Sequence, residues 1–294
     1  MAGPNILETL KQTLGKRRCI LVRSRGNRFG RRTFIIVFWA YLSVGNSGWT
    51  QMPPAQLSLE TLQAFQRYVD NLEAMHDQRR NGDKPFLWIQ DSPKNRLLVE
   101  QGEILIHQNV RHSVDIPGGI IHDWIGAMFV PGASLEKTLQ MLQDYNRHQK
   151  IFPEVVESKV ISKEDNRIRS YLRLVKEKVL KVVLNTEHEV QFLRVTDKRW
   201  SICSRSTRIN EVKDAGKPSE TELPEGEGSG FLWRFNAYWR LEEVEKGLYL
   251  ELVTVSLSRE MPSGLAWLLE PFIQEVPKES LQSTLEATRL AIKP

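Results

Sequence analysis

The chain has 294 residues, of which 40% are hydrophobic and 26% are charged, as in an ordinary globular protein with one large domain or two small ones. Its net charge of +5 is unevenly spread. Residues 1–45 hold nine of the 41 Lys and Arg but one of the 36 Asp and Glu, so they carry +8 and the remainder carries −3. A mildly acidic body argues against nucleic acid as the main partner.

A short apolar stretch, TFIIVFWAYLSVG at 33–45, follows Arg31 and Arg32 near the N-terminus. Its apolar core of about a dozen residues is too short for a comfortable membrane span. A basic region, a short apolar region and then small residues are typical of a secretory signal peptide. We therefore expect 1–47 to be a signal peptide or an uncleaved signal anchor. The protein would then be exported, periplasmic or anchored facing the periplasm, with membrane contact through this segment. A buried strand is the alternative.

The next part, 48–116, is predicted to be a linker and a helical lead-in segment that packs on the main domain at 117–294. Residues 46–58 are rich in Gly, Ser, Pro and Gln. Helical spacing of apolar residues then runs over 58–80, with Ser58 as N-cap. A short strand is expected at 103–107. One role for this segment would be to cover the mouth of a cavity.

The main domain is predicted to begin with a strand at 120–130 and a helix that is capped by Ser134 and ended by Pro153. Strand patterns follow at 155–162, 167–178, 179–195, 200–212, 231–244 and 248–260. The tail is predicted to hold one helix over 265–276 and another that starts at Pro277. Consecutive strands with short turns indicate an antiparallel meander, and helices at both of its ends make the fold α+β.

From about Ile120 to Lys293 the sequence resembles the START-like superfamily (SRPBCC), which includes polyketide cyclases and coenzyme Q-binding START-like proteins. The resemblance rests on DWIGAMFVPGASLEKTLQMLQDYNRHQKIFPEVVESKVI and on the final helix PKESLQSTLEATRLAI, and it covers about 60% of the chain. It implies a helix-grip fold, in which a curved antiparallel sheet wraps around a long C-terminal helix with a cavity between them. It includes no invariant catalytic motif, so it implies fold more than function.

The strand at 231–244, FLWRFNAYWRLEEV, has two unlike faces. We expect Trp233, Phe235 and Trp239 to form a cavity wall, with packing on the C-terminal helix as the alternative. The other face carries Arg234, Asn236, Tyr238 and Arg240. It would be solvated or, if it looks inward, would need partners such as Glu251 or Arg208. An arginine there could bind a carboxylate or phosphate of a ligand.

His188 shares a strand face with Thr186 and Val190. It would be either a satisfied or solvent-facing histidine, or a general base or polar anchor in the cavity. Arg205 and Arg208 are three apart, so we expect them on opposite faces of their strand. The candidate ligand-binding residues are therefore Trp233, Phe235, Trp239, His188, Arg208, Asn236, Tyr238 and Glu251.

Motifs for nucleophilic, metal or nucleotide chemistry are missing from the sequence: GxSxG, HExxH, a P-loop and GxGxxG after a strand. Cys203 would be the single cysteine after the leader, so we expect no intramolecular disulfide, no metal and no cofactor. The predicted function is an exported binding protein that holds or carries a lipid or other hydrophobic small molecule without catalysis. The alternatives are a cyclase or dehydratase using His188, Arg208, Asn236, Tyr238 and Glu251, or an interaction module whose cavity is filled by its own side chains.

Overall fold

The computed structural model describes residues 55–109, 113–177, 181–260 and 266–294, with side chains from 275 onward in the last range. The chain divides into two units, Met1–Gln51 and Met52–Pro294, and every described residue belongs to the second. The signal peptide or anchor expected at 1–47 lies outside the described residues. Within the described ranges, no helix combines the length and apolar character needed to cross a bilayer.

The second unit is built on an antiparallel sheet of ten strands, with the order β1-β3-β10-β9-β7-β6-β5-β4. Two short strands lie off this path, because β2 pairs with β3 and β8 with β7. The strands are β1 (Leu105–Gln108), β2 (Val114–Ile116), β3 (Gly119–Pro131), β4 (Val155–Glu164), β5 (Arg167–Glu177), β6 (Lys181–Thr196), β7 (Arg199–Lys213), β8 (Thr221–Glu222), β9 (Arg234–Val244) and β10 (Gly247–Arg259). The predicted meander is confirmed, and β10 closes it by pairing with β3 along its whole length.

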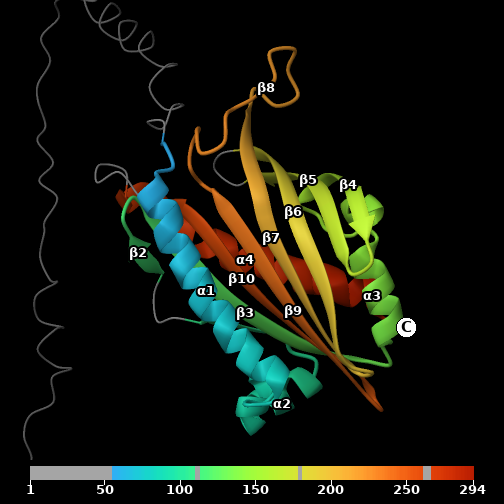
Figure 1. Ribbon diagram of the computed structural model, residues 1–294. Helices are drawn as coiled ribbons and strands as arrows, with labels where there is room; N and C mark the ends of the chain where they lie inside the picture. Colours follow the sequence, from blue (N-terminus) through green and yellow to red (C-terminus); the bar gives the residue numbers. More distant parts are fainter. Residues whose placement is uncertain (1–54, 110–112, 178–180, 261–265) are drawn as a thin grey trace, which may run out of the picture. The chain divides into compact units, whose positions relative to one another are not determined.

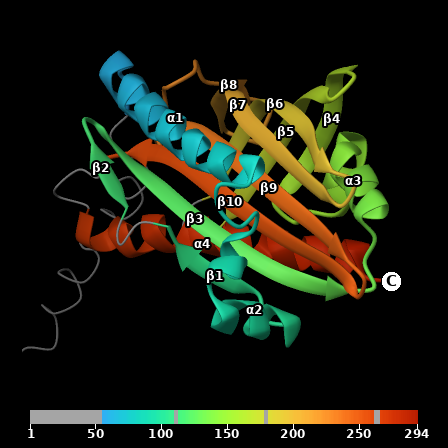
Figure 2. The ribbon, with the colours of Figure 1, turned by 60° about the horizontal axis from the view of Figure 1, so that its bottom comes forward.

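Helices cover both faces of this sheet. Figure 1 shows α1 (Leu59–Asn81) in front of the strands and α4 (Ala266–Ile292) behind them, and Figure 2 shows the same layers from another side. We call the face toward α4 the inner face and the face toward α1 the outer face. A sheet that lies against a long C-terminal helix is the helix-grip arrangement, so the expected α+β helix-grip fold is confirmed.

The C-terminal helix differs from the prediction in one respect. Pro277 was expected to start a second helix, but α4 runs through it as one helix. Downstream of Pro277 the helix buries Leu281, Leu285 and Ile292 in the core of the inner face. A proline removes one backbone donor from a helix, and the burial of this apolar stripe is what holds the remaining turns against the sheet.

Gly126 on β3 lets α4 approach the sheet closely. A Cβ atom at this position would overlap Leu285 and would lie 3.4 Å from Leu281. Since both leucines are buried, they have little room to move aside. Glycine is needed at this position because the side chains of α4 pack directly on the backbone of β3, and not because of an unusual φ angle.

The helix expected to end at Pro153 is split in two. It consists of α3 (Leu135–Gln143), which Ser134 caps as predicted, and a 3₁₀ helix, η2 (Tyr145–Lys150).

The lead-in segment packs on the outer face. Phe65, Val69 and Leu72 of α1 share a core with Val253 and Val255 of β10. A 3₁₀ helix, η1 (Trp88–Asp91), and α2 (Pro93–Glu100) follow α1 before the chain enters β1. Neither η1 nor α2 was predicted from the sequence, although Ser92 caps α2 and Pro93 stands in its first turn.

Candidate functional site: a cavity between the sheet and helix α4

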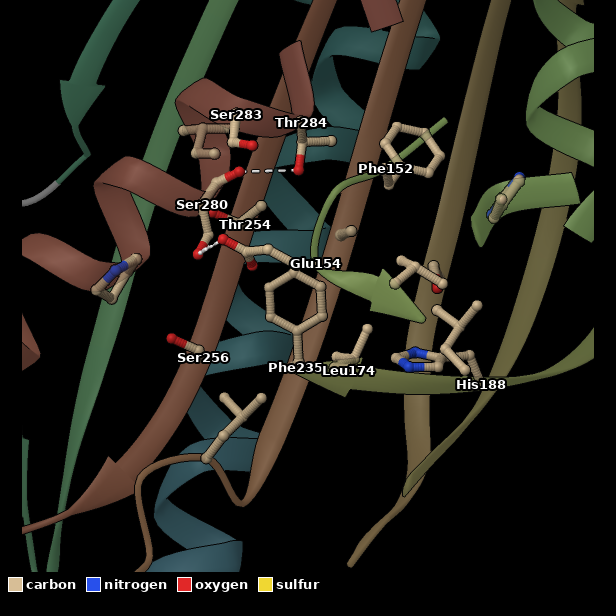
Figure 3. Close-up of a pocket in the computed structure, with 18 of the residues that line it drawn as sticks. Phe152, Glu154, Leu174, His188, Phe235, Thr254, Ser256, Ser280, Ser283 and Thr284 are labelled. Carbon is tan, nitrogen blue, oxygen red and sulfur yellow. Dashed lines mark hydrogen bonds between the residues drawn. The ribbon is translucent and has the colours of Figure 1, made fainter. Parts of the chain in front are cut away.

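A cavity of about 300 Å³ lies between the inner face of the sheet and α4. Its volume is at the lower end of the range for sites that bind small molecules. Figure 3 shows side chains from the strands, from the chain entering β4 and from α4 pointing into this space. Most of the wall is apolar and includes Leu142, Phe152, Val155, Leu172, Leu174, Leu184, Phe192, Phe231, Phe235, Ala237, Trp239, Leu252 and Leu281.

Strand register explains which residues of β9 and β10 line the cavity. Trp239 pairs with Leu252, Ala237 with Thr254, and Phe235 with Ser256. All six line the cavity, because alternate residues of a strand point to the same face of the sheet. The wall is therefore an aromatic and aliphatic surface with hydroxyl groups along one strand.

His188 lies in the cavity wall on β6 and is 4% exposed. Its ring packs edge-on to Phe235, with the ring centroids 6.5 Å apart, and Figure 3 shows the two side chains together. Its Nε2 lies 3.0 Å from Thr186 Oγ1. Burial lowers the pKa of His188 to about 4, so the ring is neutral at neutral pH.

Two further imidazoles line the cavity. His122 Nε2 lies 3.0 Å from Ser258 Oγ. His148 packs against the rings of Tyr145 and Phe152, with centroid distances of 4.1 Å and 5.1 Å. Burial lowers the pKa of each histidine to about 4. The imidazoles of the wall therefore add no charge near pH 7.

A polar cluster lies at one side of the cavity and joins the sheet to α4. Lys176 on β5 forms an ion pair with Glu154 and donates a hydrogen bond to Ser280 Oγ on α4 at 3.1 Å. Ser280 Oγ also donates to Glu154 Oε1 at 3.0 Å, as the dashed line between them in Figure 3 shows. Among the described lining residues, this pair holds the formal charges of the wall, and the two charges cancel.

Three of the eight predicted ligand-binding residues line the cavity, namely Phe235, Trp239 and His188. Whether they contact a ligand stays a prediction. The other five do not line it: Trp233, Asn236, Tyr238, Glu251 and Arg208.

Trp233 was expected on the same face as Phe235 and lies instead on the outer face. It belongs to a core that includes Phe65 of α1 and Val255. The strand β9 begins at Arg234, and Trp233 precedes it with its N–H donated to the carbonyl of Leu257 at 2.7 Å. The alternation of faces therefore does not extend back to Trp233.

The polar side of β9 is neither solvated nor part of the cavity. Tyr238 donates its hydroxyl to Glu73 of α1 at 2.8 Å, and Asn236 donates to the Tyr238 oxygen at 3.2 Å. Arg205 of β7 contacts both carboxylate oxygens of Glu73, each at 2.7 Å. These groups fasten the lead-in helix to the sheet. The sequence did not show which element covers the polar side of β9. In the structure, α1 covers it.

Arg208 and Glu251 are also outside the cavity. Arg208 donates to Glu187 at 2.6 Å and to Glu222 at 2.9 Å. The expectation that Arg205 and Arg208 occupy opposite faces is wrong. The β6–β7 pairing shifts register at this point, where Glu187 pairs with Arg208 but His188 pairs with Ser206. A bulge of one residue returns the second arginine to the outer face.

The polar cluster of Glu154, Lys176 and Ser280 was missed from the sequence. Its members are separated by 22 and 104 positions, so no local pattern connects them. Among the described residues, those that line the cavity between the sheet and α4 begin at His122. The lead-in segment over 55–109 therefore contributes none of them and does not cover the cavity in the manner suggested above.

Several solved structures resemble the chain in fold, at low sequence identity. The STAR-related lipid transfer protein from Xanthomonas axonopodis is 18% identical, over 62% of this chain and 97% of that one, with a TM-score of 0.41. Human STARD10 is 14% identical, over 68% of this chain and 78% of that one, with a TM-score of 0.38. The Zhui aromatase/cyclase from Streptomyces sp. R1128 is 12% identical, over 58% and 88%, with a TM-score of 0.36.

These similar solved structures are START-type proteins, as the sequence resemblance implied. The likeness concerns the arrangement of the chain and carries no information on ligand or activity. Neither the comparison with protein-family profiles nor that with curated proteins finds a match.

Proposed function

We propose that this protein holds or carries an uncharged, largely apolar small molecule, such as a lipid, in the cavity between the sheet and α4. The observation that supports this most directly is the wall itself. A volume of about 300 Å³ is lined mainly by aliphatic and aromatic side chains, and the formal charges of the described lining residues pair with each other. Burial of an apolar ligand against such a surface is favourable, whereas an unpaired charge would lose its hydration.

Native mass spectrometry of the protein purified from its source tests this proposal, followed by solvent extraction and incubation with a lipid panel. We expect a discrete extra mass that extracts as a lipid or another apolar compound. Ala237→Phe should fill part of the cavity and reduce the bound fraction, because Ala237 lines the wall. Val156→Phe is the matched control, since Val156 is 51% exposed and outside the wall. A bare polypeptide mass after incubation with the whole panel contradicts the proposal.

The two alternative functions require other features. A filled cavity would support the interaction module, and the described side chains leave the space open. A cyclase or dehydratase using His188 would need an acid near its ring, and the hydrogen-bond partner found there is Thr186. Turnover of a polyketide-type substrate by the purified protein would establish the enzyme in place of the carrier.

Export of the protein is part of the same proposal and rests on the basic and apolar sequence of 1–47. Peptide mapping of the protein from its source tests it. We expect the first residue of a cleaved form to lie within 46–48. Recovery of intact, soluble chain that begins upstream of 33 in the cytoplasmic fraction would contradict export.

A further inference from the structure

Two hydroxyl groups of β10 open into the cavity without hydrogen-bond partners among the described residues. They belong to Thr254 and Ser256, which line the cavity and are each 7% exposed. The indole nitrogens of Trp124 and Trp233 are also unpaired, but the fold closes them off completely, whereas both hydroxyl oxygens can be reached from the cavity. A buried polar group is almost always paired, so two that open into one cavity indicate where a ligand makes hydrogen bonds.

Thr254 has no side-chain acceptor beside it on the sheet. Its partner on β9 is Ala237, which has no polar side-chain atom. Its partner on β3 is Trp124, and an indole N–H is a donor only. A threonine hydroxyl has one hydrogen to donate, and that of Thr254 is therefore left for a group in the cavity.

Ser256 has one polar neighbour on the sheet, and the two do not pair. It stands between Phe235 of β9 and His122 of β3. The Nε2 atom of His122 lies 3.0 Å from Ser258 Oγ, and no hydrogen bond joins this imidazole to Ser256 within the described part of the chain. Thr254 and Ser256 are two positions apart, so their hydroxyls form a pair of donors on the same face of one strand.

Two hydroxyl groups of α4 line the same cavity but are already paired. Thr284 Oγ1 donates to the backbone carbonyl of Ser280 at 2.8 Å, and Ser280 Oγ donates to Glu154 at 3.0 Å. Figure 3 shows both contacts as dashed lines. The hydroxyls of β10 differ from these two because their hydrogens have no acceptor within the protein.

The rest of the wall limits what the acceptor can be. Figure 3 shows Thr254 and Ser256 toward one side of the cavity and the apolar Phe152 and Leu174 toward the other. The lysine that lines the cavity is paired with Glu154, so an anionic group would find no free cation there among the described residues. We propose that Thr254 Oγ1 and Ser256 Oγ donate hydrogen bonds to an uncharged oxygen acceptor of the ligand, such as the carbonyl of a ketone or an ester. This inference rests on the proposed function and adds the chemical class of the ligand and the side of the cavity that its polar group faces.

Two probes of nearly equal shape test the proposal: 2-acetylnaphthalene, which has a carbonyl oxygen, and 2-isopropenylnaphthalene, which has a CH₂ group in its place. Equilibrium dialysis against the full chain gives the ratio of their two Kd values. The same ratio is then measured in the double variant Thr254→Val and Ser256→Ala, which removes both donors and changes the shape of the wall little. We expect the ratio to shift by about threefold to tenfold against the ketone, as the loss of one buried hydrogen bond predicts. Comparing ratios cancels the difference in apolar transfer between the probes.

Thr284→Val is the matched control for general effects on the cavity. Thr284 lines the same cavity, but its hydrogen is already donated to the carbonyl of Ser280, so the ratio should stay unchanged. The carbonyl ¹³C NMR signal of bound 2-acetylnaphthalene gives a readout in the wild-type protein that does not depend on the folding of any variant. A hydrogen bond to the ketone oxygen should move this signal downfield of its position in cyclohexane, and the double variant should move it back.

The outcomes distinguish the two proposals. A cyclohexane-like ketone signal in wild-type protein overturns the pair of donors but leaves the apolar cavity. So does a ratio that the double variant leaves unchanged, which is the result expected if water alone satisfies the two hydroxyls. An equal shift in Thr284→Val would also contradict the pair. Wild-type protein that binds neither probe, nor the smaller apolar probe 2-fluoronaphthalene, nor any member of the lipid panel overturns the proposed function itself.

Discussion

Arg240 on β9 and Glu251 on β10 form an ion pair on the outer face of the sheet, with side-chain exposures of 4% and 1%. The Arg240 Nε–Glu251 Oε1 distance is 2.7 Å. The second carboxylate oxygen accepts the backbone N–H of Trp88 at 2.5 Å. Three segments, β9, β10 and η1, therefore meet at one carboxylate, which ties the lead-in segment to the sheet.

The first prediction concerns this ion pair. Glu251→Ala should lower the free energy of unfolding by about 3–5 kcal/mol, because it leaves the arginine charged and buried without a partner. Urea titration measures the change. Glu157→Ala is the control, since the Glu157–Lys159 pair is 51% and 57% exposed and should contribute less than about 1 kcal/mol. Equal losses of unfolding free energy in the two variants would contradict the prediction that the buried ion pair matters more for stability than the exposed one.

The second prediction separates the two faces of the sheet at neighbouring aromatic residues. Trp233→Ala should destabilise the protein by about 3–5 kcal/mol, because it empties a large space in the core beneath α1. Binding of 2-fluoronaphthalene by the protein that remains folded should be unchanged. Phe235→Ala should weaken that binding, because Phe235 lines the cavity. Thermal melts and equilibrium dialysis measure the two effects, and weaker binding in the Trp233 variant would place that residue in the wall after all.

The third prediction concerns pH. Burial lowers the pKa values of His122, His148 and His188 to about 4, below the value of about 6.5 for a histidine in the unfolded chain. Between these values the unfolded chain binds protons that the folded chain does not. Stability should therefore fall as the pH drops from about 6.5 to 4, by roughly 3 kcal/mol for each imidazole.

Urea titrations at pH 7 and pH 4 measure this effect in the wild type and in His188→Phe. Asp123 acts in the opposite sense, because burial raises its pKa, but it contributes equally to both proteins and cancels in the comparison. We expect a smaller loss of stability in the variant. A loss equal to that of the wild type would show that folding does not lower the pKa of His188.

The fourth prediction concerns the approach of α4 to the sheet. Gly126→Ala should destabilise the protein by about 1–3 kcal/mol, as overpacking of a buried contact does, because the new methyl group would overlap Leu285. Leu285→Val in the same chain should restore part of the loss by making room. Ala127→Gly, at the neighbouring position of β3, measures the cost of backbone freedom at a glycine in this strand. Gly216→Ala cannot serve as the control, because Gly216 has a φ angle of +82° that strains any other residue. Additive effects of Gly126→Ala and Leu285→Val would contradict a direct contact.

The order of elements in the main domain could be predicted from the sequence, because strand and helix periodicities are local. The short turns are also local: Asp165 and Asn166 separate β4 from β5, and Glu245 and Lys246 separate β9 from β10. The final helix could be placed too, since its apolar stripe must be buried. Its continuity through Pro277 could not, because that depends on packing against the sheet and not on the propensity of one residue.

The faces of the strands were harder to assign. Tyr238 is polar enough to suggest solvent, yet it is 4% exposed beneath α1, and its partner Glu73 lies 165 positions away. Arg208 was misplaced by a bulge that leaves no mark in the sequence. Periodicity tells that a strand has two faces, but the element that covers each face is decided by contacts between distant parts of the chain.

The division of β9 has a consequence for how this protein can change. Residues that point to the inner face, such as Ala237 and Trp239, shape the cavity, whereas Tyr238 and Arg240 hold the lead-in segment. Substitutions in one set leave the contacts of the other set in place. The size of the cavity can therefore change, by design or in evolution, without weakening the packing of the lead-in segment on the outer face.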